Sequence, residues 1–291
     1  MMNLLEKIDG YERLMRLDKP IGILLLLWPT LWALWIASQG QPDWWVVAIF
    51  VLGTVLMRSV GCVLNDIADR KFDGAVTRTK NRPLVTGEVS LKEALYLTLF
   101  LATLAFLLVI FLNKESILMS IPALFLAASY PYTKRFLSIP QAYLGLAFGF
   151  GILMAFMATW QTIPSFAWWL LAANIFWAVA YDTEYAMVDR EDDLKIGIKS
   201  SAILFGRFDV IAVMVCYVVM LVCLAMLGHA LIFGYHYYGG LGLAGIFAVY
   251  HYSLIKNRDS HQCFKAFLNN SWLGGVIFTG IIMEYYFNKV F

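Results

Sequence analysis

The sequence contains few charged residues. Asp, Glu, Lys and Arg make up 14% of its 291 residues, whereas hydrophobic residues make up 61%. A soluble domain carries about 25% charged and about 45–50% apolar residues, so this composition excludes a soluble protein and predicts one that crosses a membrane several times. The net charge of +2 is small, and the basic residues stand in short loops rather than in one patch, so nothing indicates binding to nucleic acid.

Cysteine is also scarce. Cys62, Cys216, Cys223 and Cys263 form no C-x-x-C pair and have no histidine at the spacing of a zinc site, so we expect packing residues rather than metal ligands or disulfides. A cleavable signal peptide is likewise missing, because residues 1–19 carry charges of both signs and no small-residue cleavage site. We expect this segment to form an amphipathic helix that lies along the membrane surface.

Long hydrophobic runs occupy most of the chain. A spanning helix needs about 20 mostly apolar residues. The segments that meet this requirement are residues 20–38, 44–66, 91–112, 116–132, 139–160, 164–186, 207–228, 235–255 and 271–288. The sequence therefore predicts an all-α polytopic membrane protein, with nine transmembrane helices in a single domain that covers residues 1–291.

The basic residues are unequally distributed between the two sides of this predicted bundle. Of 22 Lys and Arg, only Lys114 and Lys289 fall on the side of the first, third, fifth and seventh connections, and Arg58 falls inside a helix. All the others lie on the opposite side or at the adjoining helix ends. Because positively charged loops stay in the cytoplasm, this asymmetry predicts a cytoplasmic N-terminus. The long loops near 67–90, 130–138 and 187–206 then face the cytoplasm.

Two rows of oxygen-bearing side chains follow apolar runs on that side. They are Asn65, Asp69 and Asp73 after the second run, and Asp182, Asp189 and Asp193 after the sixth. At about 100° per helical residue, each triplet falls within a sector of about 80° or less. A carboxylate at membrane depth costs about 2.5–3.5 kcal/mol, so such residues usually have a function. Oxygen ligands without His or Cys indicate Mg²⁺ that also binds substrate phosphates. The alternative is that they are solvated helix-end acids, as we expect for Glu191 and Asp192.

Basic and phenolic side chains stand close to these acids in the sequence. Those that we consider candidates for a diphosphate site are Lys71, Arg78, Tyr130, Lys134, Arg135 and Lys199. Cations beside a metal site would bind phosphate oxygens, although loops on the cytoplasmic side carry cations for topological reasons alone. Arg58 lies seven residues before Asn65 and therefore deeper in the bilayer. It predicts an anionic ligand such as a carboxylate, or else a structural ion pair across the bundle.

Several motifs occur together and in order along the chain. NDIADRKFD (65–73) is followed by RTKNRPL (78–84), YPYTKR (130–135) and YDTEYAMVDREDDLKIGIKS (181–200), and RLDKPIG (16–22) precedes the first apolar run. In this set the sequence resembles the UbiA-type intramembrane prenyltransferases. It is most similar to the members that act on 4-hydroxybenzoate in bacterial ubiquinone biosynthesis.

The resemblance implies a nine-helix bundle around a central cavity that opens sideways to the lipid bilayer. It implies two Mg²⁺ ions held by the two acid rows, with the four motif aspartates (Asp69, Asp73, Asp189 and Asp193) as catalytic residues. Tyr130 and Lys134 match the residues that contact the diphosphate. Arg58, with Asn65 beside it, matches the site for an aromatic carboxylate. Asp66 and Arg16 belong to matching motifs, but their roles stay open.

The reaction that the resemblance implies uses polyprenyl diphosphate and 4-hydroxybenzoate. The polyprenyl group is transferred to the ring carbon ortho to the hydroxyl, at the cytoplasmic face of a bacterial inner membrane, and no obligate protein partner is expected. Two alternatives remain open. One is the same chemistry on another aromatic acceptor, such as a naphthoate or a tetrapyrrole. The other is a cation-coupled transporter, although transporter ion sites lie near the bilayer midplane rather than at one face.

Overall fold

The regular structure of the protein is helical throughout the part described by the computed structural model, which comprises residues 4–71, 73–75, 79–197 and 199–288. The elements are α1 (Leu4–Met15), α2 (Ile21–Ala37), α3 (Trp44–Asp69), η1 (Asp73–Ala75), α4 (Pro83–Thr86), α5 (Leu91–Ile110), α6 (Lys114–Thr133), α7 (Pro140–Trp160), α8 (Ala167–Ile196), α9 (Ser201–Phe205), η2 (Gly206–Phe208), α10 (Asp209–Ala230), α11 (Tyr235–Ile255) and α12 (Ser260–Phe287). The all-α prediction is confirmed, and a long helix occupies each predicted span.

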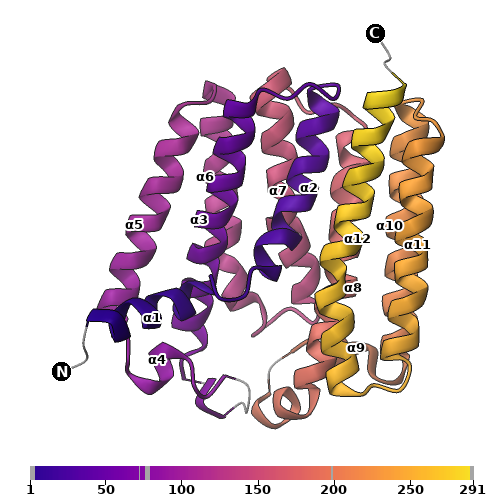
Figure 1. Ribbon diagram of the computed structural model, residues 1–291. Helices are drawn as coiled ribbons and strands as arrows, with labels where there is room; N and C mark the ends of the chain where they lie inside the picture. Colours follow the sequence, from indigo (N-terminus) through magenta and orange to yellow (C-terminus); the bar gives the residue numbers. More distant parts are fainter. Residues whose placement is uncertain (1–3, 72, 76–78, 198, 289–291) are drawn as a thin grey trace.

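The long helices run side by side, and the short elements gather at one end (Figure 1). Helices α3, α6 and α8 terminate at this end, α12 begins there, and α1, α4 and α9 lie there as well. We call it the motif end. Six helical stretches of the described chain are long and apolar enough to cross a membrane: α3, α5, α6, α7, α12 and the continuous stretch Ser201–Ala230. The count of nine spans and their orientation therefore stay predictions.

Polar side chains define where several of these helices begin. Asp43, Asn113 and Asp259 each accept a hydrogen bond from a backbone N–H in the first turn of α3, α6 and α12. At the start of α5, Ser90 and Glu93 form a reciprocal capping box. Since the first N–H groups of a helix have no partner within it, these caps fix the helix starts chemically.

The predicted cytoplasmic loops contain more helix than the sequence suggested. The 67–90 segment includes the end of α3 together with η1 and α4, and Tyr130 lies in the last turn of α6. In the 187–206 segment, α8 continues to Ile196 and stops at Gly197, whose φ of 73° suits glycine. The prediction of long loops is wrong here, because charged residues do not end a helix without a breaking residue. The consequence is that Asp189 and Asp193 are helical residues.

The helices that carry the core are joined by large aromatic rings. Trp32 on α2 stacks on Trp177 on α8 with 5.3 Å between the ring centroids, and its Nε1 donates to the backbone oxygen of Gly274 on α12 at 3.1 Å. A β-carbon at Gly274 would overlap the rings of Trp28 and Trp177. The glycine therefore allows α2, α8 and α12 to approach closely and fixes their relative positions.

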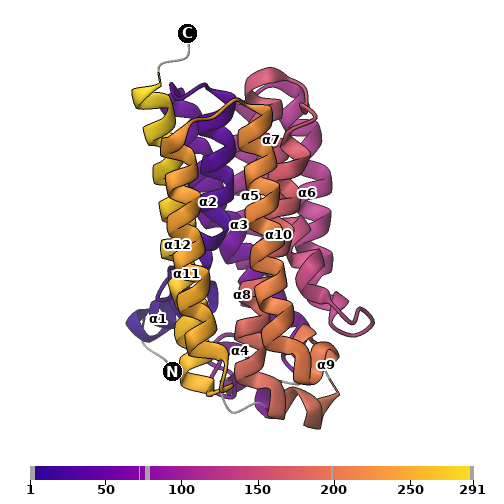
Figure 2. The same cartoon turned by 90° about the vertical axis from the view of Figure 1, so that its right-hand side faces the viewer.

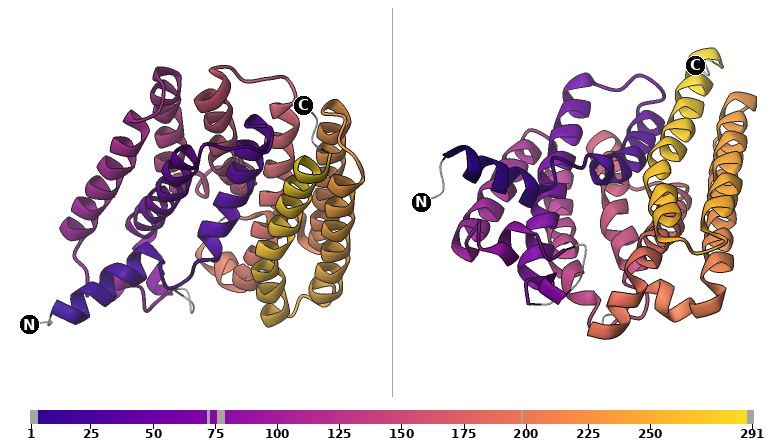
Figure 3. Two further views of the ribbon diagram at one scale, coloured as in Figure 1. Left: turned by 45° about the horizontal axis from the view of Figure 1, so that its top comes forward. Right: turned by 60° about the horizontal axis from the view of Figure 1, so that its bottom comes forward.

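Helix α1 lies across the motif end rather than along the bundle (Figure 3). Leu14 of α1 is fully buried. Lys7 Nζ donates to Glu93 Oε1 at 2.7 Å, which joins α1 to the start of α5. Leu5 and Ile8 are 76% and 52% exposed. One face of α1 thus packs on the bundle and leaves apolar side chains outside, which is consistent with the predicted position at the membrane surface.

Candidate active site

A cavity of about 1440 Å³ opens within the bundle, lined by residues of α1–α3, α5–α8 and α12. Along α3 its lining extends from Ile49 to Asp69, which is about 30 Å of helix. Far from the motif end the lining includes the apolar residues Ile49, Phe50 and Leu112. The residues of both predicted acid rows also line it: Asn65, Asp69, Asp73, Asp182, Asp189 and Asp193. The structure thus brings the two rows to one cavity.

The first row departs from the predicted helical stripe at its last member. Helix α3 ends at Asp69, so Asp73 lies in the short helix η1 and not one turn further along α3. Its carboxylate still reaches the cavity, because Arg82 Nη1 donates to Asp73 Oδ2 at 2.6 Å. Burial raises the pKa of Asp73 above its ordinary value, and the Arg82 guanidinium works against that rise. A further cation beside Asp73 would stabilise its ionised form.

The second row follows the helical prediction. Asp182, Asp189 and Asp193 all lie on α8 and line the cavity from that helix. Gln141 on α7 also lines the cavity, and its side chain lies close enough to Asp182 to interact with the carboxylate. The Gln141 Oε1 atom accepts the backbone N–H of Ser201 at 3.2 Å. This uncharged residue gives no signal in the sequence, and it couples Asp182 to the start of α9.

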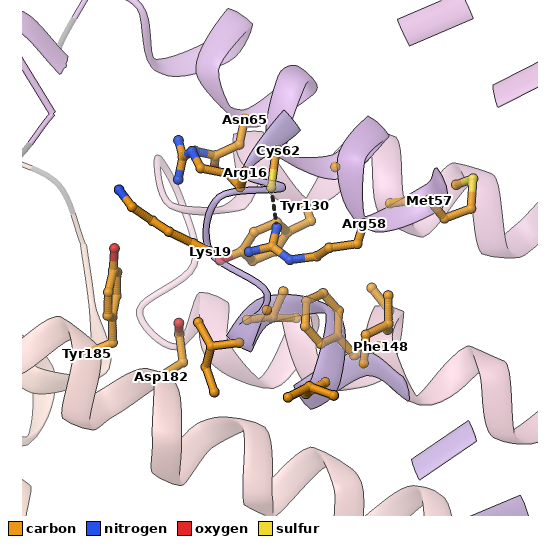
Figure 4. A pocket seen from close by; sticks show the side chains of 18 of the residues that line it. Arg16, Lys19, Met57, Arg58, Cys62, Asn65, Tyr130, Phe148, Asp182 and Tyr185 are labelled. Carbon is orange, nitrogen blue, oxygen red and sulfur yellow. Dashed lines mark hydrogen bonds between the residues drawn. The ribbon is translucent and has the colours of Figure 1, made fainter. Parts of the chain in front are cut away.

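Residues of α6 and its end stand between the two rows. Lys134 Nζ donates to Asn65 Oδ1 at 3.1 Å and to Asp69 Oδ2 at 2.9 Å. The Tyr130 phenol is buried close enough to interact electrostatically with both Asp69 and Asp182. The spacing of Tyr130 and Lys134 along α6 therefore places both side chains at the junction of the rows. In Figure 4, Asn65 and Asp182 reach the cavity from opposite walls.

Arg58 lies deeper in the cavity and retains a hydrogen-bond donor without a partner. Its Nη1 donates to Cys62 Sγ at 2.6 Å (Figure 4), while its buried Nε has no hydrogen-bond partner among the residues that the structure describes. Gly22 at the start of α2 makes room for the guanidinium, because a β-carbon there would overlap it. Because the Arg58 side chain lines the cavity, its guanidinium is placed to meet an anionic group that enters there.

Comparisons with known proteins agree with this geometry. The family model described as the UbiA prenyltransferase family matches residues 26–274. The chain belongs to the UbiA prenyltransferase family. It is 62% identical to a Methylobacillus flagellatus protein named 4-hydroxybenzoate octaprenyltransferase over 287 residues, which cover 99% of this chain and 97% of the relative. A Thiobacillus denitrificans protein of the same name is 61% identical, over 98% of this chain and 97% of its own.

Solved structures share the fold of this UbiA chain at low sequence identity. An apo UbiA homologue from Aeropyrum pernix K1 gives a TM-score of 0.79 at 23% identity, covering 89% of this chain and 97% of that one. A UbiA homologue from Archaeoglobus fulgidus bound to GPP and Mg²⁺ gives 0.71 at 18% identity, covering 95% and 98%. These likenesses establish the helical fold around the cavity.

The remaining diphosphate candidates of this UbiA chain divide into two groups. Lys199 lines the cavity, although its Nζ donates to the backbone oxygen of Phe136 at 3.1 Å. Arg135 and Lys71 are exposed and do not line the cavity. Arg78 lies outside the described residues. The structure therefore brings Tyr130, Lys134 and Lys199 to the cavity, but not Lys71 or Arg135.

Asp66 and Arg16 form a partly buried ion pair beside the cavity. Arg16 Nη2 donates to Asp66 Oδ1 at 2.6 Å, and Arg82 Nη1 lies 3.0 Å from the same oxygen. Asp66 is 1% exposed and does not line the cavity, whereas Arg16 does. Since Arg82 also binds Asp73, Asp66 anchors two arginines at the mouth of the site. Arg82 is absent from the predicted site set, although the RTKNRPL motif contains it.

The oxygen-bearing side chains of the two acid rows are the candidate ligands for Mg²⁺ in this UbiA chain. Within the described ranges, no group of three or more His, Cys, Asp and Glu converges as a ready-made metal cage. Mg²⁺ is usually held by one or two carboxylates together with substrate phosphates and water, so two rows of carboxylate and amide oxygens fit that ion without such a cage. The residues in place therefore fit Mg²⁺ that binds together with a diphosphate.

Proposed function

We propose that this protein transfers a polyprenyl group from polyprenyl diphosphate to 4-hydroxybenzoate in ubiquinone biosynthesis. The new bond forms at the ring carbon ortho to the hydroxyl, and diphosphate is released. The observation that carries the proposal is one cavity with two acid rows at the motif end, the Arg58 guanidinium deeper inside and an apolar remainder. Relatives that are 54–62% identical over nearly the whole chain bear the name of this activity.

The acid rows would hold two Mg²⁺ ions, with Asn65, Asp69 and Asp73 on one side and Asp182, Asp189 and Asp193 on the other. When bound, Mg²⁺ neutralises negative charge that develops on the leaving diphosphate. Binding to GPP and Mg²⁺ is described for the Archaeoglobus homologue and supports this assignment.

Cationic and phenolic groups supply the rest of the diphosphate site. Lys134 holds Asn65 and Asp69 in the structure, so its ammonium stands where a diphosphate between the rows would arrive. Tyr130 and Lys199 line the same region. Charge-assisted hydrogen bonds from these groups to phosphate oxygens favour the departure of the diphosphate.

Arg58 orients the aromatic substrate. Its side chain lines the cavity, and a bidentate guanidinium–carboxylate contact would fix the orientation of the ring as well as its position. The ring then lies with its hydroxyl and ortho carbon toward the diphosphate end. Holding both reactants in one cavity converts their encounter into an intramolecular step.

The bond changes follow from these positions. The allylic C–O bond breaks and its electron pair leaves with the diphosphate, which produces an allylic cation. The ring carbon ortho to the hydroxyl supplies the electron pair of the new C–C bond, and the ring proton leaves to an acid-row carboxylate or to the released diphosphate. The apolar lining around Phe50 and Phe148 holds the prenyl chain and excludes water that would trap the cation.

The motif end faces the cytoplasm in this proposal, with nine spans in a bacterial inner membrane and the protein acting without an obligate partner. The distribution of Lys and Arg supports the orientation. Helix α1 and the end of α12 also lie at opposite ends of the bundle, which an odd number of spans requires (Figure 1).

The test is product formation by membranes that contain the protein. 4-Hydroxybenzoate and a long polyprenyl diphosphate are supplied with Mg²⁺ or with EDTA. We expect a prenylated hydroxybenzoate with Mg²⁺ only. Mg²⁺-dependent diphosphate release that needs a different aromatic acceptor would change the substrate, whereas no release with any acceptor from folded protein would refute the enzyme and favour the transporter.

A further inference from the structure

A second buried polar cluster lies on the far side of α8 from the cavity. Its members are Trp177 and Glu184 on α8, Tyr217 on α10, His251 on α11 and Asn270 on α12. Each of them is 0% exposed, and none lines the cavity. We call this group the Glu184 cluster. Helices α8, α10, α11 and α12 pack together around it (Figure 2).

The hydrogen bonds of the cluster converge on one carboxylate. Tyr217 Oη donates to Glu184 Oε1 at 2.9 Å, and Asn270 Nδ2 donates to Glu184 Oε2 at 2.9 Å. Behind these donors, Trp177 Nε1 donates to Asn270 Oδ1 at 2.7 Å, and His251 Nδ1 lies 2.8 Å from the Tyr217 oxygen. Tyr217 Oη also lies 3.0 Å from Asn270 Oδ1. A phenol has one proton to give, and Asn270 Oδ1 already accepts from Trp177 Nε1, so a consistent assignment has His251 donating to Tyr217 and Tyr217 donating to Glu184.

Helix geometry connects this cluster to the second acid row. Glu184 follows Asp182 by two residues, so the two side chains are about 200° apart around α8. Asp189 and Asp193 fall within about 20° of Asp182 by the same count. The acid row and Glu184 therefore lie on opposite faces of one rigid helix. Any rotation of α8 about its axis turns both faces by the same angle.

The cluster resists such a rotation. A carboxylate inside an apolar bundle is costly unless oriented donors satisfy it, and Glu184 receives two from different helices. A second contact lies near the motif end, where Arg190 Nη1 donates to Asp209 Oδ2 at 3.2 Å. Asp209 is fully buried and also accepts from Arg258 Nη2 at 2.7 Å. A buried contact at Glu184 and a partly buried one at Arg190 hold α8 at two points along its length.

We propose that Glu184 and its donors Tyr217 and Asn270 are positioning residues, which fix the rotation of α8 and thereby aim Asp182, Asp189 and Asp193 into the cavity. The inference rests on the proposed function, because that function assigns the acid row to metal and diphosphate. Glu184 touches neither reactant nor metal; it acts through the row on the opposite face.

The first test compares two buried tyrosines that each lose one hydroxyl. Tyr217→Phe removes the donor to Glu184, whereas Tyr237→Phe removes a buried hydroxyl that donates to the backbone oxygen of Leu224 at 2.8 Å. Binding of Mn²⁺, with inorganic diphosphate present, is measured by the loss of the free-ion electron paramagnetic resonance signal. We expect Tyr217→Phe to weaken Mn²⁺ binding about 3- to 10-fold, less than the roughly 10- to 100-fold of a direct outer-shell partner. Tyr237→Phe should bind Mn²⁺ as the wild type does.

A second pair of variants keeps the inference testable if Tyr217→Phe fails to fold. Glu184→Gln replaces an acceptor by an amide that cannot accept from both donors, and the matched change is Glu284→Gln. Glu284 is 3% exposed and accepts the backbone N–H groups of Gly234 and Tyr237 at the other end of the bundle. We expect weaker Mn²⁺ binding and a lower kcat in Glu184→Gln, with an unchanged KM for 4-hydroxybenzoate. Glu284→Gln should affect thermal stability alone.

Two results would overturn the inference. One is wild-type Mn²⁺ affinity in folded Tyr217→Phe and Glu184→Gln. The other is an equal loss of affinity in the two control variants, which would indicate general loosening of the bundle. Either result leaves an active wild-type enzyme, whereas failure of the proposed function would appear as a wild-type protein that forms no prenylated product.

Discussion

Asp182 and Glu184 are acids that stand two residues apart on α8, yet their surroundings differ. Asp182 faces the cavity of about 1440 Å³ together with Asp69, Lys134 and other charged groups. Glu184 is sealed among α8, α10, α11 and α12 with 0% exposure, and both of its oxygens accept hydrogen bonds from side chains.

The difference shows how a buried acid can be assigned a role. Where protein donors converge on the carboxylate and no space adjoins it, the acid holds helices in place. Where acids and a guanidinium, such as that of Arg58, line an open cavity, they are placed to meet a ligand. One helix, α8, carries both kinds on opposite faces. The predictions below test whether the two faces behave differently.

The largest effect is expected on the cavity face of α8 and its counterpart on α3. Asp189→Ala and Asp69→Ala should each lower the rate at least about 100-fold, or about 2.7 kcal/mol of transition-state stabilisation, because each removes an acid-row carboxylate. The measurement is kcat/KM for prenyl transfer. Glu191→Ala is the matched control, since Glu191 is exposed on the same helix. Near-normal turnover in either aspartate variant would contradict the two-row site.

The next effect concerns the deep end of the cavity. Arg58→Ala should raise the KM for 4-hydroxybenzoate by about 10- to 100-fold, because a hydrogen bond to a charged group contributes about 1.5–3 kcal/mol. The KM for polyprenyl diphosphate serves as the internal control and should change little. An unchanged KM for the aromatic acid would place its carboxylate elsewhere.

A smaller effect of the same kind is expected at Gly22. Gly22→Ala puts a β-carbon into the space of the Arg58 guanidinium and should raise the KM for 4-hydroxybenzoate roughly fivefold, or about 1 kcal/mol. Gly242→Ala on α11 is the control, because a β-carbon there meets nothing within 4 Å. The KM for 4-hydroxybenzoate is measured for both variants by steady-state kinetics. Equal KM values in Gly22→Ala and Gly242→Ala would show that the Arg58 side chain can move away from the added β-carbon.

The smallest effect is expected at the loop cations outside the cavity. Lys71→Ala should change kcat/KM by no more than about twofold, because exposed substitutions away from a site stay within about 0.5 kcal/mol. Arg135 lies outside the cavity, where it donates to the backbone oxygen of Ala68 at 2.9 Å. Arg135→Ala should therefore also change kcat/KM by no more than about twofold. A tenfold loss in Lys71→Ala would mean that the loop folds over the substrate.

Much of the fold and part of the site could be predicted from periodicity and composition. Apolar runs located the long helices, and counting at 100° per residue aligned Asp182, Asp189 and Asp193, since α8 is a continuous helix through them. The same count failed at Asp73, because α3 ends at Asp69 and helical angles have no meaning beyond it. Arg82 then brings Asp73 back to the cavity by a contact between side chains.

Contacts between distant segments could not be predicted in this way. Nothing local marks Gln141 as the partner of Asp182, or Gly22 as the neighbour of Arg58. Likewise, nothing in the local sequence marks His251, which is fully buried, as the neighbour of Tyr217. Such pairings depend on how the helices pack against one another. The periodicity of a single sequence shows which face of a helix is apolar, but not which residue of another helix that face meets.

The most direct test of the account is the covalent structure of the product that the wild-type protein forms from 4-hydroxybenzoate, polyprenyl diphosphate and Mg²⁺. Mass spectrometry and nuclear magnetic resonance distinguish the isomers. The account predicts a carbon-linked product with the polyprenyl group ortho to the hydroxyl, because Arg58 fixes the carboxylate and the acid rows fix the diphosphate. An oxygen-linked ether or ester, or free polyprenol alone, would contradict it.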